Sequence, residues 1–365
     1  MEGQNQQTLR VGSLNPIQTD VLIIGAGPVG LFQVFQLGLQ EISAQVVDAH
    51  TEIGGQCSAL YPDKFIYDIP GVPRITGQQL VDQLQTQISP FKAPFHLGQC
   101  VQSILTKEDG FAVTTDTGTH FKARSIIIAA GVGAFVHREL PLPALKPFRV
   151  NTPQSFSPQV FTHLPEDVQI KGKALTVYGA NESAVTLAIK ASKQAHSGTD
   201  SGSTVLVYRR EKLEIEGQLL KDFEDAVSSG LLQFRIAQIT SIQTNQSLLT
   251  HLILTDTKGN EDTIPCDILI ESLGLSPKLG PLVDWGIEME RKALKVNPET
   301  FATSTAGIYA VGDINTYPGK RKLILSGFHE ATLAAYAIAA RLREKEINLL
   351  EYTSASTRIH KLLGV

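Results

Sequence analysis

The segment Asp20–Gly30, DVLIIGAGPVG, runs from a continuous apolar stretch directly into a glycine-rich turn. A helical pattern follows to about Leu39, and a second apolar stretch, AQVV, covers 44–47. An apolar strand, a tight turn, a helix and a second strand are the parts of a parallel sheet whose strands are joined by helices. The segment therefore predicts an α/β fold with a doubly wound parallel sheet.

The three glycines of this turn have the spacing that the phosphates of a dinucleotide require. Gly25 permits the tight turn, Gly27 lets the backbone approach a pyrophosphate, and Gly30 lets helix and strand pack closely. The helix that starts near Pro28 offers free N–H groups and a partial positive charge to the phosphates. Asp48, after the second strand, can accept hydrogen bonds from ribose hydroxyls and would repel a 2′-phosphate, which suits FAD or NAD rather than NADP. The alternative is a chance glycine-rich turn and a solvated acid.

A second unit of the same kind lies further along the chain. It begins with the apolar stretch ALTVY at 174–178 and continues through a helical pattern over 183–193 to a strand at 204–208. The sequence therefore predicts two Rossmann-like dinucleotide-binding domains, the second inserted in the first. The expected divisions are a disordered N-terminal tail over 1–18, an FAD-binding domain formed by 19–137 and 298–365, and an inserted NAD(P)H-binding domain over 138–297.

Composition argues against several other classes of protein. The net charge of −4 gives no basic excess that would suggest nucleic acid. Cys57, Cys100 and Cys266 are widely spaced and form no CxxC pair, which argues against a disulfide framework, a zinc site and dithiol exchange. The first twenty residues are polar and unlike a secretory signal, and the glycines and Pro28 within 21–39 argue against a membrane span. We therefore expect no metal site, no membrane association and a cytoplasmic location.

Several motifs around the first turn carry a family resemblance. Next to GAGPVGLF at 25–32, the chain has EIGGQ at 52–56, ALYP at 59–62 and IYD at 66–68. Further matches are AGVGAF at 130–135, AVGD at 310–313 and SGFHE at 326–330. Together they resemble the thioredoxin-reductase-like ferredoxin–NADP+ reductases, of the class-II pyridine nucleotide-disulfide oxidoreductase superfamily. The resemblance runs from about residue 19 to the C-terminus.

The resemblance implies a set of FAD-binding residues and no catalytic side chain, because the chemistry takes place on the flavin. Tyr61 would stack on one face of the isoalloxazine, and Tyr352 in the tail would cover the other face. Ordinary core or surface aromatics are the alternative for both. The residues expected to contact FAD are Gly25, Gly27, Pro28, Gly30, Asp48, Gln56, Tyr61, Val101, Phe135, Asp313 and Ser354.

Cys57 follows Gln56 and would lie near the flavin. It can be a redox thiol or a small buried hydrophobe, and the absence of a partner cysteine nearby in sequence favours the second interpretation.

The second fingerprint departs from the family pattern. Gly179 and Ser183 are in place, but Asn181 stands where the family has glycine. Arg209 and Arg210 after the next strand suit the 2′-phosphate of NADPH, whereas Glu214 stands where the family usually has another arginine. The site either binds NADPH or is a retained scaffold whose nucleotide site has decayed or changed ligand.

The resemblance implies a flavoprotein oxidoreductase that passes electrons between NADPH and a ferredoxin- or flavodoxin-like one-electron carrier through FAD, as a homodimer. Basic residues at 320–322 and 358–361 could attract an acidic carrier, or could form an ordinary solvated surface. The alternatives are an FAD protein with a lost or altered nicotinamide site that uses another donor or acceptor, and a redox sensor.

Overall fold

The computed structural model describes residues 15–149, 158–165, 168–195, 202–343 and 352–364. The chain divides into two compact units, which are Met1–Phe135 with Pro277–Val365, and Val136–Ser276. The sequence-based boundary at 297/298 differs from this division at 276/277. The intervening residues group with the first unit because Leu282, Ile287 and Leu294 are buried in one of its core clusters.

The first unit is built on a seven-stranded sheet whose order is β5–β2–β1–β8–β7–β6, with β21 also paired to β8. β1 pairs in parallel with β2 and β8, whereas β7 is antiparallel to both β6 and β8. Residues 1–14 of the expected disordered tail lie outside the described residues, and Ile17 and Gln18 belong to β1. The strands are β1 (Ile17–Ile24), β2 (Ala44–Val47), β5 (Phe95–His96), β6 (Val101–Lys107), β7 (Gly110–Thr115), β8 (His120–Ile128) and β21 (Ile308–Ala310).

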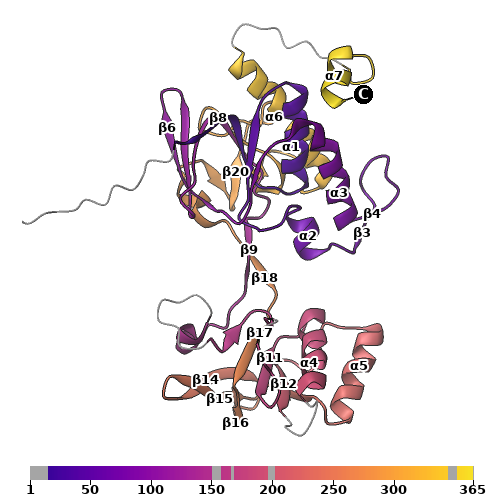
Figure 1. Ribbon diagram of the computed structural model, residues 1–365, viewed down its shortest axis with the longest axis vertical. Coiled ribbons are helices and arrows are strands. Elements are labelled where there is room, and N and C mark those ends of the chain that lie inside the picture. The colour runs from indigo at the N-terminus through magenta and orange to yellow at the C-terminus, as the bar shows by residue number, and fades with distance from the viewer. Residues whose placement is uncertain (1–14, 150–157, 166–167, 196–201, 344–351, 365) are drawn as a thin grey trace, which may run out of the picture. The chain divides into compact units, whose positions relative to one another are not determined.

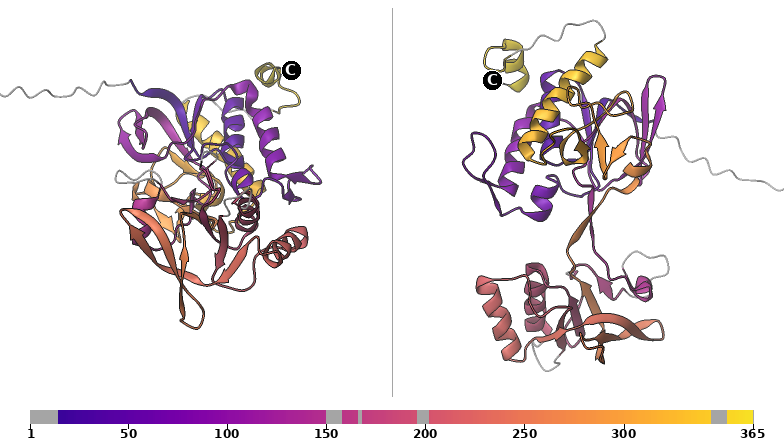
Figure 2. Two further views of the ribbon diagram at one scale, coloured as in Figure 1. Left: turned by 60° about the horizontal axis from the view of Figure 1, so that its bottom comes forward. Right: turned by 180° about the vertical axis from the view of Figure 1, so that it is seen from behind.

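Three helices gather on one side of this sheet (Figures 1 and 2), and they are α1 (Pro28–Leu39), α3 (Gly77–Ile88) and α6 (Ile324–Leu342). Ile23 and Leu31 lie in the core cluster on the helical side, whereas Leu22 and Ile126 lie in a different cluster. Neighbouring residues of β1 thus enter different cores, because successive side chains of a strand point to opposite faces. Burial on both faces explains why the strand reads as a continuous apolar run.

The smaller elements of the first unit lie around this framework. α3 begins with a capping box in which Thr76 Oγ1 accepts the Gln79 N–H at 3.2 Å and Gln79 Oε1 accepts the Thr76 N–H at 3.1 Å. The other elements are α2 (Gln56–Leu60), β3 (Phe65–Ile66), β4 (Ile75–Thr76), η1 (Ser89–Phe91), η3 (Gly280–Asp284), β19 (Met289–Glu290), β20 (Ala293–Lys295), η4 (Gly312–Ile314), β22 (Asn315–Thr316) and α7 (Thr357–Leu363).

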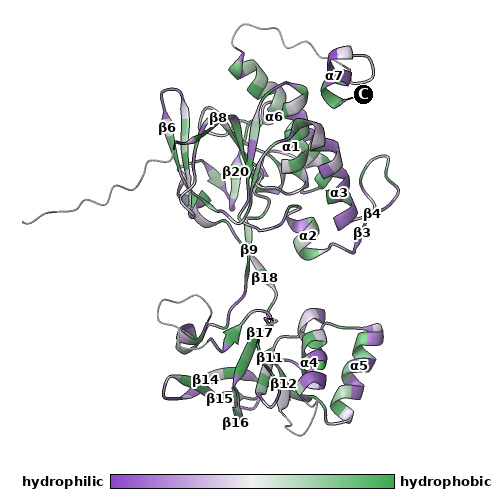
Figure 3. Ribbon diagram, in the orientation of Figure 1, coloured by the Kyte–Doolittle hydropathy of each residue, from purple (hydrophilic) through white to green (hydrophobic). Residues whose placement is uncertain are grey.

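The second unit has a five-stranded parallel sheet in the order β10–β17–β11–β12–β13. In Figure 3, β17 has the hydrophobic colour, and all its residues are buried. Helices and a three-stranded antiparallel sheet pack against different core clusters of this unit. Its elements are η2 (Pro143–Phe148), β10 (Val160–Phe161), β11 (Ala174–Tyr178), α4 (Glu182–Ala195), β12 (Ser203–Tyr208), α5 (Gly217–Ser228), β13 (Gln233–Ile236), β14 (Gln238–Asn245), β15 (Leu248–Thr255), β16 (Glu261–Pro265) and β17 (Ile268–Glu271).

Two strands carry the chain across the division between the units, β9 (Ala134–His137) and β18 (Leu275–Lys278), and they pair with each other. Within the second unit, the buried Glu271 carboxylate accepts the Leu140 N–H at 2.9 Å and a bond from Arg149 Nη2 at 2.7 Å. This ion pair joins the segment that follows β9 to the strand that precedes β18. The buried acid is therefore compensated by a cation and an N–H group.

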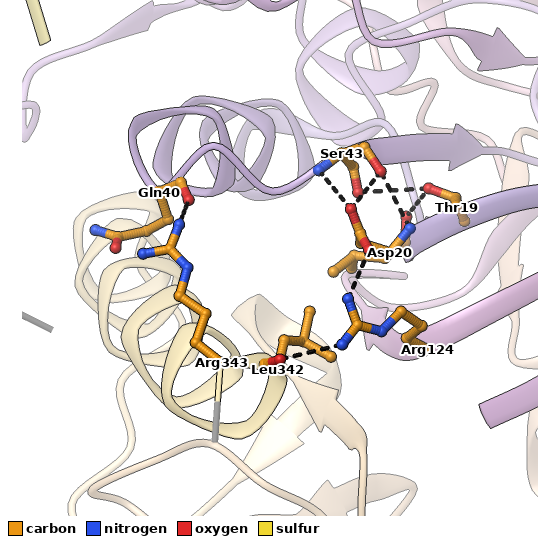
Figure 4. A network of polar contacts seen from close by, with 8 residues as sticks. Thr19, Asp20, Gln40, Ser43, Arg124, Leu342 and Arg343 are labelled. Atoms are coloured by element: carbon orange, nitrogen blue, oxygen red, sulfur yellow. Dashed lines mark hydrogen bonds and ion pairs between the residues drawn. The ribbon is translucent and has the colours of Figure 1, made fainter. Parts of the chain in front are cut away.

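Two arginines close the ends of helices in the first unit (Figure 4). Arg124 binds Asp20 Oδ1 at 3.0 Å and donates to the Leu342 carbonyl at 3.1 Å, at the end of α6. Arg343 donates to the carbonyl of Gln40, the residue that caps α1. Because the last carbonyls of a helix have no intrahelical partner, these contacts satisfy exposed acceptors and join α6 to α1 and to the sheet.

The mixed sheet of the first unit and the parallel sheet of the second, each with its helices, confirm the predicted fold class, a two-domain α/β architecture with a Rossmann-like unit in each part. Among the described residues, no helix combines the length and apolar character that crossing a bilayer requires.

Candidate nucleotide-binding sites

The glycine turn after β1 has the geometry that its spacing predicts. Gly25 has φ +115°, and a Cβ atom there would lie 2.4 Å from the Ala129 carbonyl oxygen. A Cβ atom on Gly30 would lie 1.9 Å from the Gly25 oxygen, so this glycine is needed for packing of the helix on the turn. The nearest atom to a Cβ on Gly27 is 3.9 Å away. A side chain at Gly27 would therefore meet no clash within the protein, and its absence leaves the backbone accessible where a pyrophosphate would approach.

The N-terminus of α1 carries no side-chain cap. Gly27 is the N-cap residue and makes no side-chain cap hydrogen bond, and Pro28 follows it. The first N–H groups of a helix have no intrahelical partner, so this end of α1 remains able to bind an anion.

The Asp48 carboxylate organises the same turn. Its Oδ2 accepts the Ala26 N–H at 2.6 Å, and its Oδ1 accepts the His50 N–H at 2.7 Å. Asp48 is 9% exposed and lines the cavity described below. Since each carboxylate oxygen can accept more than one hydrogen bond, Asp48 can hold the turn and still accept from a ribose hydroxyl.

A cavity of about 270 Å³ lies in the first unit at the carboxyl ends of β1, β2 and β8. In open α/β sheets, ligands bind outside the carboxyl ends of the strands. Gly30 and the tail residues Tyr352 and Ser354 do not line this cavity. The expected FAD residues that do line it are Gly25, Gly27, Pro28, Asp48, Gln56, Tyr61, Val101, Phe135 and Asp313.

The tail residues expected to lie at the flavin, Tyr352 and Ser354, do not line this cavity. Tyr352 is 68% exposed, and Ser354 is exposed as well. The following helix, α7, contacts η1, and Arg358 in it pairs with Glu41 and donates to the Leu39 carbonyl. These contacts hold the tail against the far end of α1, away from the glycine turn.

Gln56 and Asp313 meet across the cavity wall. Gln56 Nε2 donates to Asp313 Oδ2 at 3.0 Å, although 257 residues separate the two along the chain. The motifs around them were singled out separately in the sequence, and the structure brings them to one site.

A buried charge cluster supports the segment that carries Asp313. The Glu330 carboxylate, at 0% exposure, accepts the Gly312 N–H at 2.7 Å, Asn315 Nδ2 at 2.8 Å and the Tyr317 hydroxyl at 2.9 Å. Lys320 pairs with the same carboxylate and donates to the Gly312 carbonyl at 2.9 Å. Both polar groups of Gly312 are thus fixed by one ion pair. Sequence reasoning gave Glu330 no such role and placed Lys320 in a basic cluster that would either attract an acidic carrier or form an ordinary solvated surface.

Burial controls the ionisation of this cluster. Desolvation lowers the pKa of Lys320, while the Glu330 carboxylate acts in the opposite direction. Burial and the hydrogen bond to Glu330 raise the pKa of Tyr317 to about 12. The tyrosine therefore remains a neutral hydrogen-bond donor at physiological pH.

Cys57 lies in the cavity wall as a buried thiol. Its side chain is 0% exposed, and Sγ lies 3.7 Å from the Tyr61 hydroxyl. Burial raises the pKa of the Cys57 thiol, and burial followed by the charge of Cys57 raises that of the Tyr61 hydroxyl. Since the thiolate is the reactive form of cysteine, this environment disfavours thiol chemistry.

His50 is a cavity residue that sequence reasoning missed. Its Nε2 accepts the Phe135 N–H at 3.1 Å, and the two rings stack at 5.7 Å between centroids. The sequence signal that could have identified His50 is its position two residues after Asp48. Residues 278–282, 323 and 324 also line the cavity, and no sequence motif had marked them. Lys322, from the basic cluster at 320–322, lines it as well.

The second glycine turn differs from the first. A Cβ atom on Gly179 would lie 2.1 Å from the Ser272 oxygen, so this glycine is required for the turn. Asn181 is not among the residues with positive φ, so no left-handed conformation compensates for the missing glycine there. Its Oδ1 instead accepts the Ala184 N–H at 2.9 Å and caps α4. Ser183 is exposed in the first turn of α4.

Arg209 and Arg210 directly follow β12 and are exposed. β12 pairs in parallel with β11, so their position is at the same sheet edge as the turn at 179–181. The Glu214 N–H donates to the Ala180 carbonyl at 2.9 Å, which brings the acid to this turn as well.

The described residues contain no cluster of three or more His, Cys, Asp or Glu side chains that could hold a metal ion.

Comparisons with known proteins agree with this geometry. Residues 19–341 match the pyridine nucleotide-disulphide oxidoreductase family. A ferredoxin–NADP reductase of Verminephrobacter eiseniae is 46% identical over 355 residues, covering 96% of this chain and 97% of that protein. A ferredoxin–NADP reductase of Polaromonas sp. is 44% identical over 370 residues, covering 100% and 98%.

Solved structures show the same fold at low identity. A bacillithiol disulfide reductase from Staphylococcus aureus has a TM-score of 0.59 at 17% identity, covering 90% of this chain and 100% of that one. A thioredoxin reductase from Lactococcus lactis has a TM-score of 0.55 at 21% identity, covering 88% and 99%. With nearly full-length relatives at over 40% identity, and with the motifs gathered around one cavity, the chain belongs to the ferredoxin–NADP reductase family of the pyridine nucleotide-disulphide oxidoreductases.

Proposed function

We propose that this protein is a flavoprotein oxidoreductase that passes electrons between NADPH and a ferredoxin- or flavodoxin-like one-electron carrier through FAD. The main supporting observation is the cavity at the carboxyl ends of β1, β2 and β8, with an open glycine turn, an uncapped helix end and an acid at its wall. Two relatives that are over 40% identical to this chain are named ferredoxin–NADP reductases, and this supports NADPH and ferredoxin as the two electron-exchange partners.

The residues of the cavity fit FAD, and each has a distinct task. Gly25, Gly27 and Pro28 present the open turn and the N–H groups of α1 to the pyrophosphate. Asp48 accepts from the ribose of the adenosine, and Asp313 accepts from the ribityl hydroxyls or lies beside the pyrophosphate. FAD, when bound, supplies the chemistry that connects a two-electron donor to a one-electron carrier.

Side chains at the other lining positions exclude water and orient the ring system. Tyr61 lies against the isoalloxazine, held by its contact with the buried Cys57. Gln56 keeps Asp313 in place through their hydrogen bond, while Val101 and Phe135 provide apolar wall. No side-chain acid or base is assigned, because hydride transfer requires none.

The second unit provides the nicotinamide nucleotide site. Gly179 forms its turn, Asn181 and Ser183 lie at the start of α4, and Arg209 and Arg210 supply cations for a 2′-phosphate. The carrier is an acidic protein attracted by exposed cations such as Lys322, which lines the cavity. Lys320 does not contribute to such a surface, because it is paired with Glu330.

The homodimeric state and the cytoplasmic location are part of the proposal, and they rest on the family resemblance. Light scattering of the purified protein tests the first, with twice the chain mass expected. Fractionation of the source cells tests the second.

Anaerobic titration of the purified protein with NADPH tests the function. We expect a yellow protein whose flavin absorbance bleaches with one equivalent of NADPH and returns when oxidised ferredoxin or flavodoxin is added. A colourless protein that cannot be reconstituted with FAD would refute the proposal. A yellow protein that neither NADPH nor NADH bleaches would instead support a flavoprotein with another donor or a sensing role, which the capped helix end at Asn181 favours.

A further inference from the structure

The two nucleotide turns of this chain present their helix ends differently. At the first turn, Gly27 offers no side-chain cap to α1. At the second, Asn181 Oδ1 accepts the Ala184 N–H at 2.9 Å and so occupies a donor that a phosphate could use. The second turn is therefore the poorer pyrophosphate site, and groups beside the turn carry more of the nucleotide recognition.

Glu214 is fixed beside the second turn by its backbone. Its N–H donates to the Ala180 carbonyl at 2.9 Å, and residues 181 and 214 form an isolated parallel bridge. Leu213, which precedes it, is 8% exposed and belongs to the core of the unit. This anchoring leaves the Glu214 side chain exposed at the mouth of the turn.

Two cations stand at the same edge of the sheet. Arg209 is the first residue after β12, and Asp48 is likewise the first residue after β2 in the first unit. Within the described part of the chain, the side chains of Arg209, Arg210 and Glu214 are exposed and form no hydrogen bond or ion pair. Two guanidinium groups and one carboxylate are therefore free to interact with the adenosine ribose of a nucleotide.

We propose that Glu214 is a specificity-determining residue that narrows the preference of this site for NADPH over NADH. A carboxylate here accepts from the free ribose hydroxyls of NADH and repels a 2′-phosphate, whereas Arg209 and Arg210 attract the phosphate. With Glu214 present, the affinities for NADPH and NADH differ less than they would if only the two arginines acted. This inference rests on the proposed nicotinamide site in the second unit.

The test compares the wild-type holoenzyme with Glu214→Gln and Glu214→Arg, and with Glu224→Gln as the matched control. Glu224 is exposed on α5, so its change removes the same charge away from the turn. Calorimetry gives the affinity for 2′,5′-ADP, which carries the phosphate without nicotinamide. Steady-state reduction of ferricyanide gives kcat/KM for NADPH and for NADH.

We expect Glu214→Gln to strengthen 2′,5′-ADP binding and to raise the NADPH-to-NADH ratio of kcat/KM by at least about threefold, as for one solvent-exposed charge. Glu214→Arg should raise both further, and all gains should shrink in high salt, which screens exposed charges. Values for Glu214→Gln that match Glu224→Gln would overturn the inference.

Failure of the inference can be told apart from failure of the proposed function. If neither nucleotide reduces the flavin, the proposed function fails, and 2′,5′-ADP binding alone then decides the role of Glu214. If NADPH reduces the flavin but neither wild type nor Glu214→Gln binds 2′,5′-ADP, the proposed function stands and the inference about Glu214 is refuted.

Discussion

Gln56 donates a hydrogen bond of 3.0 Å to the carboxylate of Asp313, and this contact joins the N-terminal and C-terminal segments of the first unit at its cavity. The bond fixes one Asp313 oxygen and leaves the other free to accept from a ligand. The cavity is therefore completed only when both segments are folded together.

Loss of the Asp313 carboxylate should weaken FAD retention more than it weakens the fold. For Asp313→Ala, we expect FAD affinity to fall by about tenfold or more, the effect of losing one hydrogen bond to a charged group. Fluorescence of released FAD during dilution or dialysis measures this loss. Asp109→Asn, at an exposed ion pair with Lys122, is the control and should retain FAD. Equal retention by both variants would remove Asp313 from the site.

Alanine at Gly27 and at Gly30 should have opposite consequences. A Cβ atom at Gly30 would overlap the Gly25 carbonyl, so Gly30→Ala should destabilise the apoprotein by about 1–3 kcal/mol. Gly27 has φ −72°, and a Cβ atom there would make only an ordinary van der Waals contact of 3.9 Å, so Gly27→Ala should change stability by less than about 1 kcal/mol. Its methyl group would still occupy the cavity and weaken FAD binding. Urea unfolding of the apoproteins and FAD titration separate the two effects, and the reverse pattern would contradict the assigned roles.

Breaking the Lys320–Glu330 pair should destabilise the protein strongly. Glu330→Gln leaves the Lys320 ammonium buried at 7% side-chain exposure without its carboxylate, at a cost of about 3–5 kcal/mol. Lys320→Met combined with Glu330→Gln should recover part of this loss, because no unpaired charge is then buried. Urea unfolding of the single and double variants measures the coupling. A double variant less stable than Glu330→Gln would show that the charge pair is not the cause.

Cys57 should make folding stability depend on pH in the alkaline range. Burial raises the pKa of this thiol above its value in the unfolded chain. The stability that the buried, protonated thiol contributes is therefore fully present below the unfolded-state pKa and is lost as the pH rises through the folded-state pKa. The stability of the wild type relative to Cys57→Ala should therefore fall between pH 8 and pH 10. Thermal unfolding of both proteins across that interval measures the difference, and a constant difference would show that the thiol ionises equally in both states.

The same burial should protect Cys57 from alkylation at neutral pH. We expect iodoacetamide to modify Cys100, which is only half-buried, before Cys57. Peptide mapping after a short exposure gives the order.

Local patterns in the sequence were sufficient to predict both glycine turns and their flanking strands. DVLII and ALTVY are apolar because parallel strands are buried on both faces, and a glycine turn must follow wherever the helix packs closely on its strand. The motif residues Gln56 and Asp313 were likewise found from sequence, and the cavity brings them together.

Features that depend on distant partners could not be predicted in this way. Lys320 is one of three consecutive basic residues and looks like surface, until the fold supplies Glu330 beneath it. Leu282 and Ile287 are apolar whichever core they join, so composition could not decide on which side of the boundary they belong. The position of Tyr352 depends on contacts of the following helix with η1, which no local pattern records.

The pairing of β9 with β18 has a consequence for how a domain of this size can interrupt another. A Cβ atom on Gly133 would lie 2.3 Å from the Lys278 oxygen, so the two ends of the interrupted unit already touch. An insertion between touching ends forces no rearrangement of its host, and its length adds to the closure entropy only logarithmically. The first unit is thus compatible with a short hairpin at this point as well as with a whole second nucleotide-binding unit. The paired strands β9 and β18 are therefore a suitable place to exchange or remove the second unit without redesigning the first.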